Sequence, residues 1–201
     1  GLLYGEGYFS QYLDSNGWQQ ESYKTINPDN LPLCPALGKD GQPVVISVQT
    51  RSGSIFARVW RCDVGRIPLY LLDTNIPNNT DEDRRLTARL YGGDIRIRIR
   101  QEVMLGIGGA RALSALGIQP SVIHMNEGHS AFLTLELVRR QVQENGLSFY
   151  AALQLVAAGN VFTTHTPVPA GNDAFPLGLM EKYFSHYPTQ VGIDFATFCS
   201  F

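Results

Sequence analysis

The sequence has little cysteine, no excess of charge of one sign and no long apolar run. Its three cysteines, Cys34, Cys62 and Cys199, lie far apart and in no metal-type spacing, which favours free thiols in a reducing compartment. Lysine plus arginine number 16 and aspartate plus glutamate 18, so the net charge of −2 gives no electrostatic case for nucleic acid or an acidic membrane surface. No apolar run approaches the about 20 residues of a membrane helix, and no signal peptide opens the chain. We therefore expect a cytoplasmic protein with no membrane partner.

What the sequence does contain is an ordinary globular composition, with 44% hydrophobic residues in 201. That length suffices for one domain with a real core. The chain begins at Gly1 without methionine and ends abruptly in D-F-A-T-F-C-S-F, which we interpret as a piece of a longer protein. We expect a single partial domain over residues 1–201, β-rich over 1–90 and alternating between helix and strand over 91–201.

The first half predicts antiparallel strands. Val44–Thr50 and Ile55–Asp63 alternate apolar and polar residues, and Ser52–Ser54 is typical of a turn between them. Pro68–Asp73 is more uniformly apolar, as in a buried strand. Before them, Gly1–Glu21 is rich in aromatics and glycines. We favour packing of Tyr4, Tyr8 and Phe9 into a core over the alternative, a wall of a sugar or cofactor site.

Asp94–Arg100 reads D-I-R-I-R-I-R. Strict alternation predicts a strand with isoleucines on one face and arginines on the other. The arginine face is either a solvated basic surface or an anion site, because guanidinium groups suit phosphate oxygens.

Gln101–Leu116 is helical in pattern, and Gly117 is a fitting end for it. Its G-I-G-G-A-R run is no dinucleotide fingerprint, because no strand precedes it and Arg111 stands at the last glycine position. Four residues share one helical face and predict close packing on a sheet: Gly106, Gly109, Ala110 and Leu113. Further helices are expected over residues 130–144, from Phe149 to near Gly159, and over residues 177–184.

Two segments, Val122–Phe132 and Val161–Asn172, each read as an apolar strand followed by a polar turn. Helices between them predict a parallel pair, whose carboxyl ends lie at one edge of a sheet. Open α/β sheets bind ligands at that edge. We therefore expect Glu127, His129 and His165 to converge on one cleft.

Three kinds of site come into question for this cluster. The first is a zinc site formed by His124, Glu127 and His129 of H-M-N-E-G-H, with His165 as a further ligand. These residues lack the H-E-x-x-H spacing of a helical zinc site, so no metal is expected. In a serine hydrolase, G-H-S-A-F would form the nucleophile elbow, but Phe132 replaces the required final glycine. The acid and base of that triad would be Asp173 and His186, with Ser130 as nucleophile.

The third kind is a sugar or phosphate site. A carboxylate beside a histidine fixes its tautomer, and both groups bond hydroxyls. The helix that starts after His129 adds the positive end of its dipole. Hydrogen-bonded turn residues with no ligand would show the same spacing, so the residues alone leave both interpretations open.

The chain resembles the α-glucan phosphorylases (glycogen, starch or maltodextrin phosphorylase), notably their shorter bacterial or archaeal type. Seven blocks in order carry the resemblance: G-L-L-Y-G-E-G-Y-F-S-Q at Gly1, G-W-Q-Q-E at Gly17, L-Y-L-L-D-T-N at Leu69, R-L-Y-G-G-D at Arg89, R-I-R-Q-E-V-M-L-G-I-G-G at Arg98, H-M-N-E-G-H-S-A-F at His124 and T-T-H-T-P-V-P-A-G-N-D at Thr163.

The resemblance implies an α/β fold, part of a Rossmann-like domain of the two-domain glycosyltransferase fold, with an antiparallel β meander insertion. It implies reversible phosphorolysis of α-1,4-glucan (glycogen, starch or maltodextrin) by phosphate to α-glucose 1-phosphate, with retention. Pyridoxal phosphate is the family's cofactor, bound by a carboxyl-terminal domain that no segment here matches. We therefore expect this chain alone to bind no pyridoxal phosphate and to be inactive, and its parent to be a homodimer without allosteric control.

Carried over residue by residue, the resemblance makes His165 the catalytic histidine beside the transferred glucosyl unit. Glu127 and His129 line the same cleft as substrate-binding residues. Asp94 and Arg98 lie where the family's gate loop leads into a helix, although Arg96 departs from the family's more acidic run. Two alternatives remain: a non-catalytic glucan-binding module, or another glycosyltransferase of the same two-domain fold.

Overall fold

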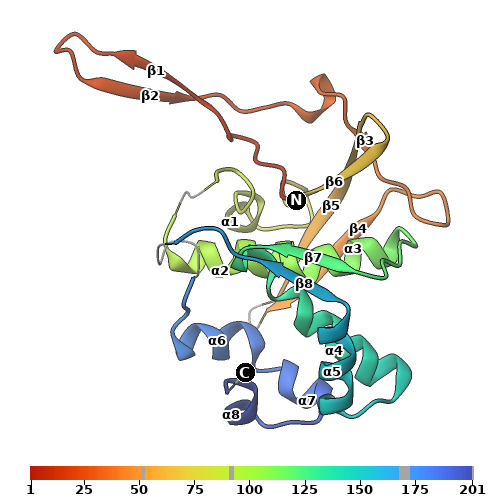
Figure 1. Cartoon of the computed structure of the whole chain (residues 1–201). Coiled ribbons are helices and arrows are strands. Elements are labelled where there is room, and N and C mark those ends of the chain that lie inside the picture. The colour runs from red at the N-terminus through yellow and green to blue at the C-terminus, as the bar shows by residue number, and fades with distance from the viewer. Residues whose placement is uncertain (51–52, 91–92, 168–172, 201) are drawn as a thin grey trace.

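A computed structural model describes residues 1–50, 53–90, 93–167 and 173–200. Within these residues the chain has a mixed α/β fold with small antiparallel and parallel sheets (Figure 1). None of the described helices is both long and apolar enough to cross a membrane. The bounds of the shorter elements are β3 at Cys34–Pro35, α1 at Asp81–Arg84, a 3₁₀ turn at Pro28–Asn30, α7 at Tyr187–Val191 and α8 at Phe195–Phe198.

The predicted antiparallel meander is confirmed. β4 (Val45–Thr50) and β6 (Ile67–Asp73) each pair with the long β5 (Gly53–Val64), which also pairs with β3. The alternation of β5 places its apolar residues on the core side. β6 departs from the expected buried strand, because only its last two residues are buried. Ser52, in the expected turn, lies outside the described residues.

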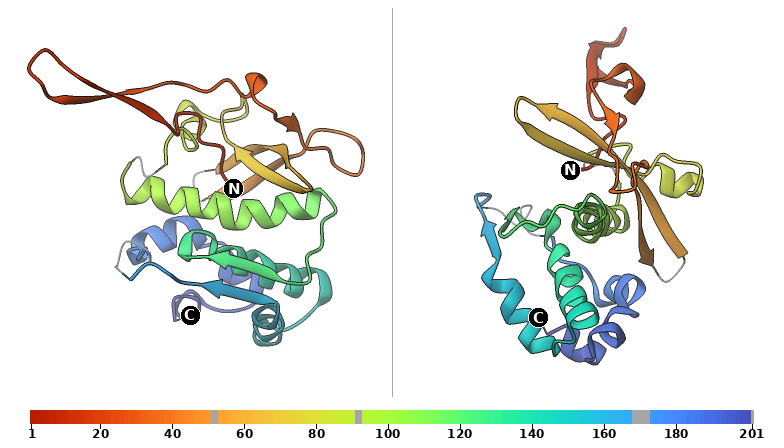
Figure 2. Two further views of the ribbon diagram at one scale, coloured as in Figure 1. Left: turned by 45° about the horizontal axis from the view of Figure 1, so that its top comes forward. Right: turned by 90° about the vertical axis from the view of Figure 1, so that its right-hand side faces the viewer.

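A continuous helical rod lies against this sheet. It consists of α2 (Ile95–Val103), a π-helical turn at Met104–Gly108 and α3 (Gly109–Ala115). Figure 2 shows the rod between the antiparallel sheet on one side and the parallel strands on the other. Gly117 ends it with a φ of 73°, as predicted.

The strand predicted for Asp94–Arg100 is wrong, because these residues begin α2. Asp94 is the N-cap, and its Oδ1 accepts hydrogen bonds from Arg96 N at 2.9 Å and Ile97 N at 3.3 Å. In a helix Ile99 lies one turn before Val103, and both are fully buried in the core. The cap and this i, i+4 contact outweigh the strand-like alternation.

The glycines of the rod pack differently from the prediction. A Cβ on Gly106 would lie 2.7 Å from Leu133 N, so Gly106 permits close contact with the start of α4 and not with a sheet. Gly108 faces the sheet instead, since a Cβ there would lie 3.2 Å from Ile46 Cδ1, whereas Gly109 faces open space.

We expect Gly106→Ala to lower the free energy of unfolding by about 1–3 kcal/mol, because the obstacle is backbone and cannot rotate away. Gly109→Ala, three residues along the same rod, is the matched control. It should raise the free energy by about 0.5–1 kcal/mol, since the added methyl meets nothing and alanine favours helix. Urea unfolding of both variants tests this pair, and equal effects would contradict the packing described.

The predicted parallel pair is also confirmed. β7 (Ile123–Asn126) pairs in parallel with β8 (Asn160–Thr163), and α4 (Leu133–Asn145) and α5 (Phe149–Ala158) form the crossover between them. α6 (Leu177–Phe184) follows with the predicted bounds and packs with α7 and α8 below the sheet (Figure 1). The carboxyl ends of β7 and β8 therefore lie at one edge.

A third, two-stranded sheet forms an arm that projects from the body in Figures 1 and 2. It pairs β1 (Phe9–Leu13) with β2 (Gln19–Tyr23). The expected packing of Tyr8 and Phe9 into a core is wrong, because they are 86% and 43% exposed, whereas Tyr4 does pack against the core. Aromatic content cannot distinguish a core strand from a protruding hairpin, since both use the same residues.

Candidate functional site

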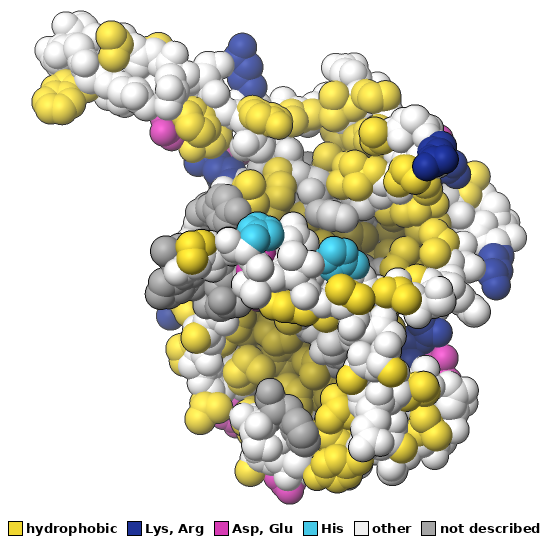
Figure 3. Space-filling model, in the orientation of Figure 1, with side chains coloured by type: hydrophobic (Ala, Val, Ile, Leu, Met, Phe, Trp, Pro, Cys, Tyr) yellow, Lys and Arg dark blue, Asp and Glu magenta, His cyan; other side chains and the backbone are white. Residues whose placement is uncertain are grey.

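The candidate site lies where the carboxyl ends of β7 and β8 face the first turns of α2. Figure 3 shows histidine side chains exposed on the face of the molecule that carries β7 and β8. The site residues come from three segments that are remote in sequence. These segments are the α2 helix, the turn after β7 and the turn after β8.

Glu127 joins the two turns. Its buried carboxylate accepts, at Oε1, the backbone N–H groups of His165 at 2.9 Å and Thr166 at 2.8 Å. The pKa of Glu127 is lowered to about 2, in spite of its burial. The main cause is the hydrogen bond from His165 N, and the hydrogen bonds from Thr166 and the nearby imidazole of His165 add to it. Glu127 is therefore an anion that holds the turn after β8 in place. Its Oε2 is buried and has no hydrogen-bond partner among the described residues.

The backbone of Glu127 is strained. Its φ of 60° and ψ of −173° fall in a region that is nearly restricted to glycine, and it is the one non-glycine residue of the described chain with positive φ. Such a conformation costs about 1–3 kcal/mol and persists where the surroundings over-determine it. Here it turns the carboxylate toward the end of β8.

His165 is held between both strand ends. Its Nδ1 lies 3.1 Å from Glu127 Oε1, and its Nε2 lies 3.0 Å from Asn126 Oδ1. The side chain is nonetheless 60% exposed. A fixed and accessible imidazole next to a carboxylate is an arrangement suited to contact with a polar ligand. His124, which lies on β7, bonds the side chain of Thr163 instead.

His129 belongs to a neighbouring cluster around Arg98. Arg98 Nη2 lies 2.7 Å from His129 Nδ1, and Arg98 Nε lies 2.7 Å from Asp173 Oδ2. Since a guanidinium only donates, Nδ1 is the acceptor and the hydrogen of a neutral His129 is on Nε2. The side chain thus presents a donor away from Arg98.

Glu102 completes this cluster, and sequence analysis missed it. It is buried, and its Oε1 lies 3.4 Å from Arg98 Nε and 3.7 Å from His129 Nδ1. Burial and then the hydrogen bond to Asp173 raise the pKa of Glu102 to about 8. Burial acts to raise the pKa of Asp173, but the hydrogen bonds to Glu102 and Arg98 outweigh it, so the pKa of Asp173 is lowered. Glu102 therefore keeps the proton of this carboxyl pair. Its helical spacing of four from Arg98 was the available signal.

Ligand atoms of Glu102, His129 and Asp173 lie within 4.8 Å of one another, a geometry that could hold a metal ion. Arg98 already places its guanidinium among them at 2.7 Å from two of the three residues. A divalent cation there would lie against this positive charge, so the cluster favours arginine over a metal. The same contact engages Asp173, which the serine hydrolase alternative required as its triad acid.

Comparison with characterised proteins identifies the chain's relatives. Over 189 residues it is 47% identical to glycogen phosphorylase of Mycobacterium tuberculosis, a match that covers 91% of this chain and 22% of the relative. Over 187 residues it is 45% identical to maltodextrin phosphorylase of Thermococcus litoralis, again covering 22% of the relative. This chain is a partial-length homologue of the glycogen and maltodextrin phosphorylases.

A more distant relative, glycogen phosphorylase of Aquifex aeolicus, is 32% identical over 194 residues, which cover 96% of this chain and 28% of the relative. No family model matches the chain. This chain thus spans only 22% to 28% of the length of these three phosphorylases.

The predicted site residues of this phosphorylase homologue form two neighbouring groups. Glu127 and His165 are in contact, as expected. Arg98 and His129 instead line a pocket of about 260 Å³ with Glu102 and Tyr4. Asp94 caps the helix that carries Arg98, and its backbone oxygen accepts a hydrogen bond from Arg98 N at 3.1 Å. The residues expected in a single cleft are therefore adjacent, with Glu127 and His129 two residues apart in one turn. Part of the turn after β8, residues 168–172, lies outside the described residues.

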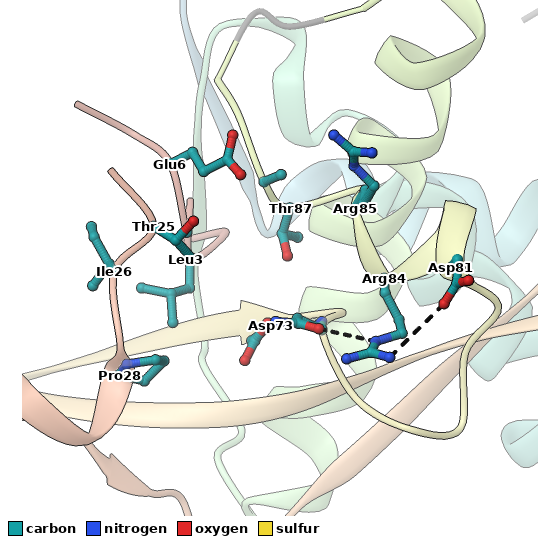
Figure 4. A pocket seen from close by; sticks show the side chains of 13 residues that line it. Leu3, Glu6, Thr25, Ile26, Pro28, Asp73, Asp81, Arg84, Arg85 and Thr87 are labelled. Carbon is teal, nitrogen blue, oxygen red and sulfur yellow. Dashed lines mark hydrogen bonds and ion pairs between the residues drawn. The ribbon is translucent and has the colours of Figure 1, made fainter. Parts of the chain in front are cut away.

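A larger pocket of about 400 Å³ lies elsewhere, between the N-terminal segment and the loop of α1 (Figure 4). Two of its charged side chains are engaged with neighbours: Arg84 Nε donates to Asn75 Oδ1 at 3.0 Å, and Glu6 pairs with Arg89 at 2.7 Å. None of the predicted site residues lines it. The β7–β8 edge therefore remains the candidate site of the phosphorylase homologue.

Proposed function

We propose that this chain forms the sugar-side wall of the active-site cleft of an α-glucan phosphorylase, within part of a Rossmann-like amino-terminal domain of the two-domain glycosyltransferase fold. The reaction is reversible phosphorolysis of α-1,4-glucan to α-glucose 1-phosphate with retention. The Glu127–His165 pair at the ends of two parallel strands carries this proposal, because it fixes an accessible imidazole at the edge where such sheets bind ligands. The homology to phosphorylases supports the choice of this substrate class.

Each residue has a distinct part in this proposal. His165 contacts the transferred glucosyl unit, while Glu127 holds the backbone of His165 and Thr166. His129, which accepts from Arg98 at Nδ1, donates from Nε2 to a sugar hydroxyl or phosphate oxygen. Asp94 starts the helix that positions Arg98. These fixed dipoles and charges act by orientation and by stabilising an oxocarbenium-like state.

Pyridoxal phosphate, the phosphorylase cofactor, requires a lysine for its Schiff base. The lysines of this chain do not fit that role at the candidate site. Lys24 follows β2, Lys39 packs against Gly117, and Lys182 lies on α6 with its Nζ 5.6 Å from the Tyr183 ring centroid. We propose that residues beyond these 201 hold the cofactor, whose phosphate assists proton transfer in the complete enzyme. The chain alone is then inactive.

The test is phosphorolysis of maltoheptaose with phosphate and added pyridoxal phosphate, measured as glucose 1-phosphate. The 201-residue chain is assayed beside a protein extended at both ends along its reading frame. We expect activity in the extended protein alone, which would also contain the cofactor absorbance band. Activity in neither, with glucan still bound, would reject the phosphorylase proposal and favour a glucan-binding module.

A further inference from the structure

We propose that one face of the β1–β2 arm is a second glucan-binding surface, separate from the β7–β8 edge. The arm is unusual because its strands carry large aromatic side chains without a core to cover them. Tyr12 is 55% exposed and Trp18 is 71% exposed. Figure 3 shows hydrophobic side chains standing on the projecting arm. Exposed aromatic groups of this size commonly mark binding surfaces.

The two faces of the arm differ in what they contact. On one face Phe9 is directly opposite Tyr23, with ring centroids 5.3 Å apart. Arg89 lies over the Tyr23 ring at 3.9 Å and forms an ion pair with Glu6 at 2.7 Å. This face therefore anchors the base of the arm to the body.

Between Phe9 and Tyr23, the other face carries no charged residue apart from Asp14. Its register places Tyr12 opposite Gln20 and Ser10 opposite Ser22. Trp18, two residues before Gln20, lies on the same face and diagonally next to Tyr12. Two aromatic rings thus alternate with amide and hydroxyl groups. We call this surface the Tyr12–Trp18 face.

The turn at the tip holds the face in a fixed shape. Asp14 Oδ1 accepts from Asn16 N at 2.9 Å and Trp18 N at 3.0 Å, and Asp14 Oδ2 accepts from Gln20 Nε2 at 3.0 Å. These hydrogen bonds lower the pKa of Asp14, and the bond from Trp18 N contributes most. Gly17 supplies the positive φ of 81° that the turn requires. The carboxylate is engaged by its own turn, so the face offers a ligand no free charge.

A neutral ligand with apolar faces and a rim of hydroxyl groups matches this chemistry. Pyranose rings pack their C–H faces on aromatic rings and bond amide and hydroxyl groups at their edges. A charged partner would find no free counter-charge among these residues, and a purely apolar one would bury the hydroxyl groups of Ser10 and Ser22 away from water. The choice of α-1,4-glucan among neutral sugars rests on the proposed function. The rings would hold a glucan chain while its end occupies the cleft.

The test uses the 201-residue chain and matched variants. Tyr12→Ala removes a ring from the Tyr12–Trp18 face, and Leu13→Ala removes a comparably exposed apolar side chain from the opposite face. Affinity electrophoresis in amylopectin gels reports binding. We expect Tyr12→Ala and Trp18→Ala each to weaken binding about tenfold, and Leu13→Ala to leave it unchanged. All three positions are exposed, and far-UV circular dichroism checks that the fold is kept.

Tryptophan fluorescence gives a second readout, because Trp60 is buried and Trp18 is the tryptophan that acrylamide can reach. Maltoheptaose should protect wild-type Trp18 from quenching. Wild-type affinity in both ring variants would overturn the inference. Protection of Trp18 that rises with protein concentration in the absence of glucan would also overturn it, because it would indicate that a second copy of the chain covers this face. If the extended protein phosphorolyses maltoheptaose while the ring variants bind normally, this inference fails and the proposed function stands.

Discussion

In the extended protein, Glu127→Ala should lower the rate of maltoheptaose phosphorolysis by about 100-fold. The carboxylate accepts both backbone N–H groups of the turn after β8 and lies 3.1 Å from the His165 ring. Without it, nothing compensates for the strained backbone at position 127, and the imidazole shifts. Displacements of about 1 Å at a reacting centre cost on this order. Steady-state measurements of kcat and KM check the prediction, and kcat should carry most of the loss.

Glu144→Ala is the control for this variant. Glu144 lies at the exposed end of α4 and pairs with Arg140 at 3.2 Å, away from the strand ends. It should retain wild-type kcat and KM. A Glu127→Ala enzyme with normal kcat, beside a His165→Ala enzyme without activity, would mean that His165 needs no support from Glu127.

The second large effect is on stability, and it follows from the proton on Glu102. In the folded state the pKa of Glu102 is raised from 4.5 to about 8, so the native state binds a proton that the unfolded state releases. A raised pKa contributes stability that is complete below about pH 4.5 and is lost as pH rises through about 8. Wild-type protein should therefore lose free energy of unfolding across this window, on the order of a few kcal/mol. Asp173 titrates below the window, because its pKa is lowered.

Glu102→Gln should remove this decline. Glutamine keeps the size of the side chain, donates from its amide to Asp173 and does not ionise. We expect the variant to be more stable than wild type near pH 8 and the two to differ little near pH 4.5. Urea unfolding across the window measures both curves, with Glu144→Gln as an exposed control. Parallel curves for Glu102→Gln and wild type would contradict the shared proton.

Local patterns in the sequence were enough to predict most elements. Alternation predicted β4 and β5, helical periodicity predicted α5 and α6, and a glycine with positive φ ended α3 where expected. The β–α–α–β order predicted the parallel pairing of β7 and β8, because a crossover of that kind permits no other simple arrangement. From that pairing followed the contact of Glu127 with His165 across 38 residues.

Other features could not be read from local pattern. The run from Asp94 to Arg100 alternates like a strand, yet the N-cap and the burial of Ile99 in the core make it helical. Glu102 gives no sign in the sequence of its raised pKa, since desolvation depends on what packs over it. Tyr8 and Phe9 looked like core residues and lie on an exposed arm, because burial requires a partner surface that composition does not specify.

By itself, the sequence determined the periodic elements, the turns that end them and the residues at the ends of β7 and β8, because each depends on side-chain spacing along one segment. Seven ordered blocks also determined the phosphorylase relationship. Only the tertiary structure decided that Arg98, Glu102, His129 and Asp173 share one cluster, and that the aromatic rings of the arm stay in solvent. These properties arise from charges and surfaces that meet across distant segments, so they exist only once the chain has folded.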